Sequence, residues 1–108
     1  MQGIDFSNLL SVRGVDGFLS LDLNYNVLEV NIPAELNQSA LVNACGKFID
    51  SRKALASLDT DILLTERGVL VLARIEDFYL VIVAGYKESV DVARLSELIE
   101  QIKISLGS

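Results

Sequence analysis

One apolar stretch, ILLTERGVLVLARIEDFYLVIVA at residues 62–84, constrains the fold of this chain more than any other feature. It has the length of a transmembrane helix. However, it contains several charged residues, including Glu66, Arg67, Arg74 and Glu76. Because each charge near the centre of a membrane costs about 2.5 to 3.5 kcal/mol, the stretch is not predicted to span one.

The charged residues divide this stretch into three pieces of strand length, at residues 62–65, Val69–Ile75 and Phe78–Ala84. All three pieces are rich in β-branched and aromatic residues, which favour strands. Breaks of two or three residues are typical of turns between neighbouring antiparallel strands. We therefore expect a three-stranded meander. Its last strand is apolar at every position, so we expect it near the middle of a sheet that is covered on both faces.

A second pair of strands is expected at residues 17–22 and 27–32. The turn between them is Asn24-Tyr25-Asn26, where Asn tolerates the left-handed backbone region. Pro33 ends the second strand because it has no backbone N–H to donate.

A helical period follows at residues 37–56, where apolar residues recur at steps of three and four. Asn37 or Ser39 is expected to cap its N-terminus. Gly46 lies inside this helix, where a glycine permits close approach of a neighbouring backbone. The apolar stripe of the helix consists of Leu41, Cys45, Phe48, Ile49 and Leu55.

Two further helices are predicted. A long one follows Ser89 as its N-cap, and Asp91 and Arg94 within it are spaced for an ion pair. A short one at residues 5–12 is ended by Gly14. The apolar positions of the long helix are Val92, Leu95, Ile99, Ile102 and Leu106, and those of the short helix are Phe6, Leu9 and Leu10.

These elements predict an α+β fold in the order α-β-β-α-β-β-β-α, with a five-stranded antiparallel sheet in a two- or three-layer α/β sandwich. The length of 108 residues predicts a single domain over residues 1–108. With 51% hydrophobic and 22% charged residues, the chain has the composition of a folded domain.

The charge and the residue types exclude several classes of function. The net charge of −6 argues against nucleic-acid binding, which needs a basic face. The chain has no histidine, so His-based catalysis and His-based metal sites are excluded. Cys45 is the only cysteine, so no intrachain disulfide can form. The N-terminus has no basic leader with an apolar core, and a cytoplasmic location is therefore expected.

The acidic and glycine-containing motifs do not complete a site. Asp22-Leu-Asn24-Tyr-Asn26 begins like a calcium loop, but Val27 and Pro33 stand where an EF-hand needs Gly and Glu. Gly46-Lys47 lacks the Ser or Thr of a phosphate loop. The carboxylate pairs Glu76-Asp77 and Asp59/Asp61 are expected to lie in a turn and at the start of a strand. We therefore predict no catalytic residues, no metal, no cofactor and no enzymatic activity.

The joints and elements together resemble the roadblock (dynein light chain) domain family. The resemblance is carried by VRGVDG leading into FLSLD, by VLEV, ALVNACGKFI and ILLTERGVLVLARIEDFYLVIVAG, and by ARLSELIEQI in the final helix. It covers about residues 6 to 104. It implies a roadblock/longin-like fold and a non-catalytic homodimer that joins sheets edge to edge and pairs middle helices. It also implies a regulator or scaffold for small Ras-like GTPases.

The resemblance places the dimer interface on the strand at residues 61–66 and on the helix at residues 37–56. An edge strand is normally guarded by charge or proline, and residues 62–65 contain neither. This strand is covered either by its own chain or by a second copy. The expected interface residues are Leu41, Cys45, Phe48, Arg52, Ile62, Leu63, Leu64 and Thr65.

A separate surface is expected to meet the GTPase or another scaffold protein. Lys47, Arg52 and Lys53 form either a solvated helix face or a docking patch for an acidic partner. Asn43, Lys47 and Lys53 are the expected partner-binding residues. The alternative function is a small-ligand sensor of the PAS or GAF kind, which requires a pocket with convergent polar groups on one sheet face.

Overall fold

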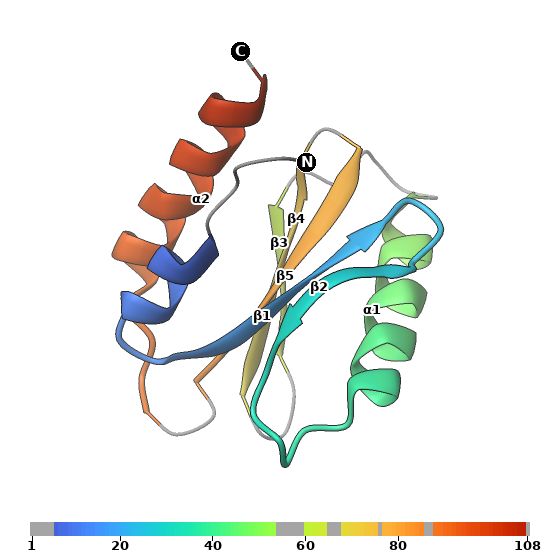
Figure 1. Ribbon diagram of the computed structural model, residues 1–108, viewed down its shortest axis with the longest axis horizontal. Helices are drawn as coiled ribbons and strands as arrows, with labels where there is room; N and C mark the ends of the chain where they lie inside the picture. The colour runs from blue at the N-terminus through green and yellow to red at the C-terminus, as the bar shows by residue number, and fades with distance from the viewer. Residues whose placement is uncertain (1–5, 54–59, 65–67, 76, 86–87, 108) are drawn as a thin grey trace.

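The computed structural model describes residues 6–53, 60–64, 68–75, 77–85 and 88–107. These residues form a 3-10 helix, five strands and two α-helices (Figure 1). In chain order the elements are η1 Phe6–Ser11, β1 Val15–Asp22, β2 Val27–Asn31, α1 Gln38–Lys53, β3 Thr60–Leu64, β4 Val69–Ile75, β5 Phe78–Ala84 and α2 Val92–Gly107.

The strands form one antiparallel sheet in the order β2-β1-β5-β4-β3. The bounds of β4 and β5 agree with the expected Val69–Ile75 and Phe78–Ala84. Strand β5 lies at the centre of the sheet, and every one of its residues is buried. The prediction that this strand is covered on both faces is therefore confirmed.

The covers on both faces come from helices of this chain. Helix α1 lies over one face, and η1 and α2 lie over the other (Figure 1). Under α1, Cys45 and Ile49 pack with a layer of strand residues that includes Leu72 and Val81. The opposite core joins Leu9 of η1, Val12 just after it, and Leu95, Leu98 and Ile99 of α2 to the other side of the sheet. The strand residues there are Phe18, Val71, Ala73, Ile75, Phe78, Leu80 and Ile82.

Helix α1 begins where one of the two expected caps stands. The Asn37 side-chain oxygen accepts a hydrogen bond of 3.0 Å from the backbone N–H of Ala40. The Asn37 carbonyl accepts another of 3.1 Å from Leu41. Asn37 is therefore the N-cap, because it satisfies backbone donors that have no partner within the helix. Residues 54–56, which the helix was expected to include, lie outside the described residues.

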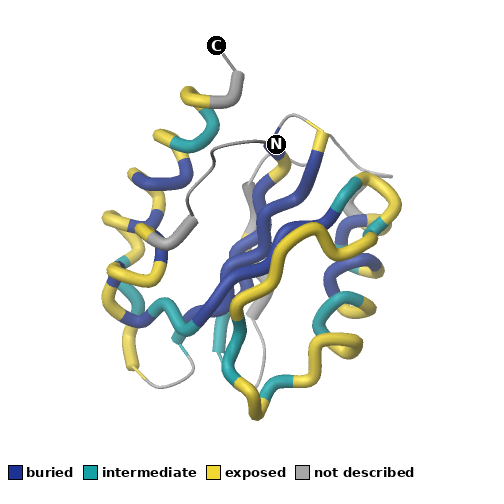
Figure 2. The backbone as a smooth tube through the Cα atoms, viewed as in Figure 1, coloured by how far each residue is buried: buried dark blue, intermediate teal, exposed yellow. Residues whose placement is uncertain are grey.

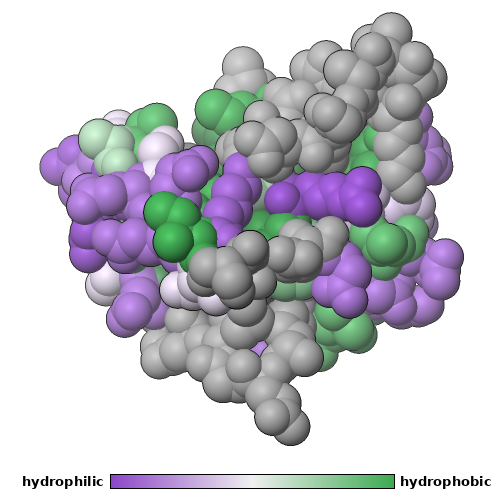
Figure 3. Space-filling view, turned by 90° about the horizontal axis from the view of Figure 1, so that it is seen from above, coloured by the Kyte–Doolittle hydropathy of each residue, from purple (hydrophilic) through white to green (hydrophobic). Residues whose placement is uncertain are grey.

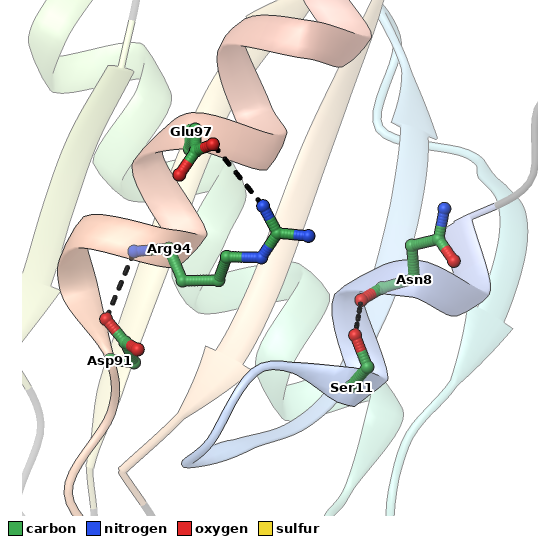
Figure 4. Close-up of polar contacts among 5 residues, drawn as sticks. All are labelled: Asn8, Ser11, Asp91, Arg94 and Glu97. Atoms are coloured by element: carbon green, nitrogen blue, oxygen red, sulfur yellow. Dashed lines mark hydrogen bonds and ion pairs between the residues drawn. The ribbon is translucent and has the colours of Figure 1, made fainter.

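The N-cap of α2 differs from the prediction. Asp91 takes this role, since its carboxylate accepts the backbone N–H of Arg94 at 3.1 Å (Figure 4). Helix α2 begins at Val92, three residues after the expected cap Ser89. The Arg94 guanidinium contacts Glu97 at 3.4 Å. The spacing that predicted an ion pair with Asp91 therefore reflects helix capping.

The buried faces of η1 and α2 also differ in part from the predicted stripes. The first segment is a 3-10 helix instead of an α-helix, and its Leu10 is exposed. In α2 the first predicted position, Val92, is 55% exposed, while Leu98 is buried. Leu95 and Ile99 are buried as predicted, and Leu98 lies beside them at helical spacing, whereas Val92 stands in the first turn of the helix. The side chains of Phe6 and Leu106 lie outside the described residues.

Backbone hydrogen bonds fix η1 and α2 relative to the sheet. The carbonyl of Arg13 accepts the N–H of Asp91 at 2.8 Å, and that of Gly14 accepts the N–H of Gly85 at 2.8 Å. Gly14 has a φ of +89°, a conformation that residues with a side chain rarely adopt. Within η1, the Ser11 hydroxyl donates to the carbonyl of Asn8 (Figure 4). These contacts join the end of η1 to the start of α2. Neither of the described α-helices combines the length and the hydrophobicity needed to cross a bilayer.

Candidate interaction surfaces

Strand β3 lies at one edge of the sheet, paired with β4 on its inner side. The backbone register places Ile62 opposite Val71, on the face that α2 covers elsewhere. Nevertheless Ile62 is 50% exposed, so α2 does not reach over it. Ile62 therefore keeps an exposed apolar side chain at this edge of the sheet.

Leu63, Leu64 and Thr65 are the other interface residues predicted for this stretch of the chain. The backbone of β3 includes Leu63 and Leu64, but their side chains lie outside the described residues. Thr65 lies outside them altogether.

The predicted apolar stripe of α1 packs against its own sheet. Cys45 is fully buried in the core beneath the helix, so its assignment to a dimer interface is wrong. Leu41 and Phe48 are half-buried and pack against the same core. Helical periodicity identified the apolar side of the helix correctly, but the covering partner is the sheet of the same chain. Most of the contact surface of these residues is therefore already used.

Burial also determines the chemistry of the Cys45 thiol. Removal from water disfavours the thiolate, which raises the pKa of Cys45 to about 11. At neutral pH this thiol is protonated and packed among apolar residues. Cys45 is therefore an inert core cysteine in this structure.

The role of Gly46 is different from the one expected. A Cβ atom at this position would lie 3.3 Å from Cδ2 of Tyr25, which is tight contact. The ring of Tyr25 comes from the β1–β2 turn and also lies 6.0 Å, centroid to centroid, from the ring of Tyr79. Gly46 therefore admits a side chain of its own subunit, where close approach of a neighbouring backbone was expected.

The exposed side of α1 carries small and polar residues. Ala40, Asn43, Ala44 and Lys47 are all exposed and recur at steps of three and four. Two of them, Asn43 and Lys47, belong to the predicted partner-binding surface, and their exposure leaves them accessible. Arg52 and Lys53 lie in the last turn of α1, and their side chains are outside the described residues. The structure thus brings Asn43 and Lys47 to one face.

Acidic residues do not assemble into a metal site in the described part of the chain, where no group of three or more potential ligands is found. The Asp22 carboxylate instead closes the β1–β2 turn. It accepts backbone N–H groups from Asn24 at 2.8 Å and from Asn26 at 2.9 Å. These hydrogen bonds, chiefly those from Asn26, lower the pKa of Asp22. The calcium-like DLNYN motif is therefore a hairpin turn, as predicted.

An exposed apolar surface that the sequence did not reveal lies on β2. All five residues of this strand are exposed, among them Val27, Leu28 and Val30. The alternation in VLEVN resembled that of an ordinary half-buried strand, because the sequence does not give the order of strands in the sheet. Viewed from above, the described surface otherwise shows small apolar groups dispersed among hydrophilic ones (Figure 3).

Comparisons with known proteins identify the fold. The chain matches no protein-family model and no curated protein sequence. It does match solved structures. One is a Roadblock/LC7 domain from Streptomyces avermitilis, which shares 15% sequence identity with a TM-score of 0.59. The superposition covers 94% of each chain. The protein therefore has a roadblock-like fold, a mixed α+β arrangement with an antiparallel sheet, as its sequence predicted.

Proposed function

We propose that this protein is a non-catalytic homodimeric interaction module that regulates or scaffolds a small Ras-like GTPase. The main support for a dimer is the exposed edge of β3, where Ile62 is half-exposed. An exposed apolar residue on an edge strand favours pairing with another strand. The roadblock-like fold adds support, because the family resemblance implies dimers that join at this edge.

The order of residues in β3 favours a second copy as the partner strand. Antiparallel pairing of two Thr60–Leu64 strands along their whole length places Ile62 opposite Ile62. Asp61 then lies opposite Leu63, and no two like charges face each other. Opposed β-branched residues stabilise an antiparallel pair, whereas opposed like charges destabilise it. The central pair of Ile62 residues therefore favours pairing of two β3 strands at this edge.

The exposed face of α1 offers a second contact. Its small residues Ala40 and Ala44 permit another helix to approach closely, since the interaxial distance depends on the side chains between the helices. In this proposal the middle helices of two subunits meet at Ala40 and Ala44, and the GTPase contacts Asn43 and Lys47 beside them. It replaces the predicted contact through Cys45, which is buried in the core.

Cross-linking tests the strand pairing directly. The variant Ile62→Cys should form an intermolecular disulfide under mild oxidation, because opposed residues of antiparallel strands lie within disulfide distance. Ile104→Cys is the matched control, since Ile104 is 66% exposed but lies on α2. A covalent dimer formed by the first variant alone fits the proposal. Equal cross-linking of both variants, or of neither, contradicts it.

Binding of a GTPase is tested separately. Ras-like proteins encoded by the same genome, loaded with GDP or a GTP analogue, should be retained by the immobilised protein in at least one nucleotide state. Lys47→Glu should weaken this binding, and Arg13→Glu provides the same charge change at the end of η1. Failure of both nucleotide states to bind removes the GTPase part and leaves a scaffold function.

The remaining parts of the proposal are a single domain in the cytoplasm without a cofactor. For the alternative ligand sensor, a retained metabolite in native mass spectrometry would be the decisive finding. A ligand sensor needs a pocket on one face of the sheet, and both faces of the central strands pack against the chain's own helices.

A further inference from the structure

The outer edge of β2 is a second exposed edge of the same sheet, on the side opposite β3. Among the described residues, β2 pairs only with β1. Figure 2 shows this strand as exposed beside the buried centre of the sheet. Val27 is 36%, Leu28 is 49% and Val30 is 40% exposed. Apolar side chains therefore line an edge whose outward backbone groups are available for strand pairing.

The two faces of β2 differ in chemical character. The register places Val30 opposite Leu19, on the side of the sheet covered by α1. It places Glu29 opposite Ser20, on the side of α2. A strand added beside β2 would therefore meet apolar side chains on one face and a carboxylate on the other.

A second copy of the chain does not suit this edge. Antiparallel pairing of two Val27–Asn31 strands along their whole length places Glu29 opposite Glu29. Like charges directly opposite each other destabilise a strand pair. The centre of β2 thus disfavours self-pairing, whereas the centre of β3, at Ile62, favours it.

The charge around β2 indicates the kind of strand that fits. The sequence from Gly14 to Gly46, which contains β1 and β2, has four acidic residues and neither lysine nor arginine. The acidic residues are Asp16, Asp22, Glu29 and Glu35, of which Glu29 and Glu35 are exposed. A basic residue on an added strand would face Glu29 in this acidic region, and opposite charges across strands stabilise the pair.

We propose that the outer edge of β2 binds an extended segment of another protein in which apolar residues alternate with lysine or arginine. The apolar residues lie on the α1 side beside Val30, and the basic residues lie on the α2 side beside Glu29. Backbone hydrogen bonds give this mode its affinity, and the alternating side chains give it specificity. Because β2 and β3 are opposite edges, this docking does not depend on the dimer or on GTPase binding.

The test uses two labelled nine-residue peptides, one alternating valine with lysine and the other alternating valine with glutamate. Fluorescence anisotropy should show that the lysine peptide binds more tightly to the wild-type protein. Glu29→Lys should weaken that binding about fivefold or more and improve binding of the glutamate peptide. Glu88→Lys makes the same charge change at an exposed residue before α2 and should leave the preference unchanged.

Amide hydrogen exchange locates the bound peptide. Residues 27–31 should become protected when the lysine peptide binds, while the amides of β3 should not change. Glu29→Gln, which removes the charge without reversing it, should give an intermediate affinity if Glu29→Lys does not fold. The proposal is overturned if the two peptides bind wild-type protein equally or neither binds. Protection outside β2 alone, or equal effects of the substitutions at Glu29 and Glu88, would overturn it too.

Discussion

The contact between Tyr25 and Asp50 should measurably couple the β1–β2 turn to helix α1. The Tyr25 hydroxyl donates a hydrogen bond of 2.5 Å to the Asp50 carboxylate. Tyr25 has a φ of 68°, a left-handed conformation that costs a residue with a side chain about 1 kcal/mol or more. The structure holds Tyr25 there because its ring packs between Gly46 and Tyr79 while its hydroxyl meets Asp50.

The substitution Tyr25→Phe removes the hydrogen bond and keeps the ring. Hydrogen bonds to charged groups contribute about 1.5 to 3 kcal/mol. Asp50 is exposed, so water replaces part of that contribution and we expect a loss of about 1 kcal/mol. For a domain of this size, that change lowers Tm by about 4 °C.

A double-mutant cycle isolates the contact from other effects of the substitutions. The free energy of unfolding is measured in urea for the wild type, Tyr25→Phe, Asp50→Ala and the double variant. A coupling energy of about 0.5 to 1.5 kcal/mol is expected, because the two residues are in direct contact. A coupling below about 0.3 kcal/mol, within the usual limit for independent sites, would refute the reasoning.

Two further perturbations follow from the described contacts. Asp91→Ala should destabilise the protein by about 1 kcal/mol through loss of the α2 N-cap, and Ser89→Ala should have a smaller effect in the same urea titration; the reverse order would restore Ser89 as the cap. The Cys45 thiol has a pKa of about 11 in the folded protein against 9.0 for an unperturbed thiol. Its contribution to stability is therefore fully present below pH 9 and is lost as the pH rises towards 11. The wild type should lose up to about 3 kcal/mol more than Cys45→Ala over that window, and parallel pH profiles would show that burial of this thiol is not the cause.

The position of the central strand could be predicted from the sequence because the residues of that strand alone indicate it. Phe78–Ala84 is apolar at every position, and such a strand must be covered on both faces. The structure places it in the middle of the sheet with all its residues buried. The cap of α1 was narrowed to Asn37 or Ser39, and the structure shows Asn37, because a local hydrogen bond determines a cap.

The errors concern contacts between segments that are distant in the sequence. The apolar stripe of α1 was recognised, but periodicity does not show whether a sheet or a second subunit covers Cys45. Similarly, Gly46 indicated that a neighbouring group approaches α1 closely. The sequence did not show that this group is Tyr25, which comes from a turn far away in the chain. Within that turn, a left-handed conformation was expected at Asn, yet tertiary packing imposes it on Tyr25.

The sequence indicated one of the two candidate surfaces, on β3, but not the other, on β2. Ile62 was identified because residues 62–65 contain neither charge nor proline, and the structure leaves its side chain half-exposed. The β2 surface was missed because its exposure depends on the order β2-β1-β5-β4-β3. The order of strands depends on the whole fold, so the local sequence VLEVN does not show that β2 lies at an edge of the sheet.

The mass of the protein in solution tests the central claim that β3 pairs with the β3 strand of a second copy. Static light scattering at micromolar concentration should give twice the mass of a single chain for the wild type. Ile62→Lys should give the single-chain mass, because the pairing would place two ammonium groups opposite each other. Ile104→Lys, which changes an exposed residue on α2, should remain a dimer. A wild-type protein that is monomeric at this concentration, or an Ile62→Lys variant that remains dimeric, would contradict the account.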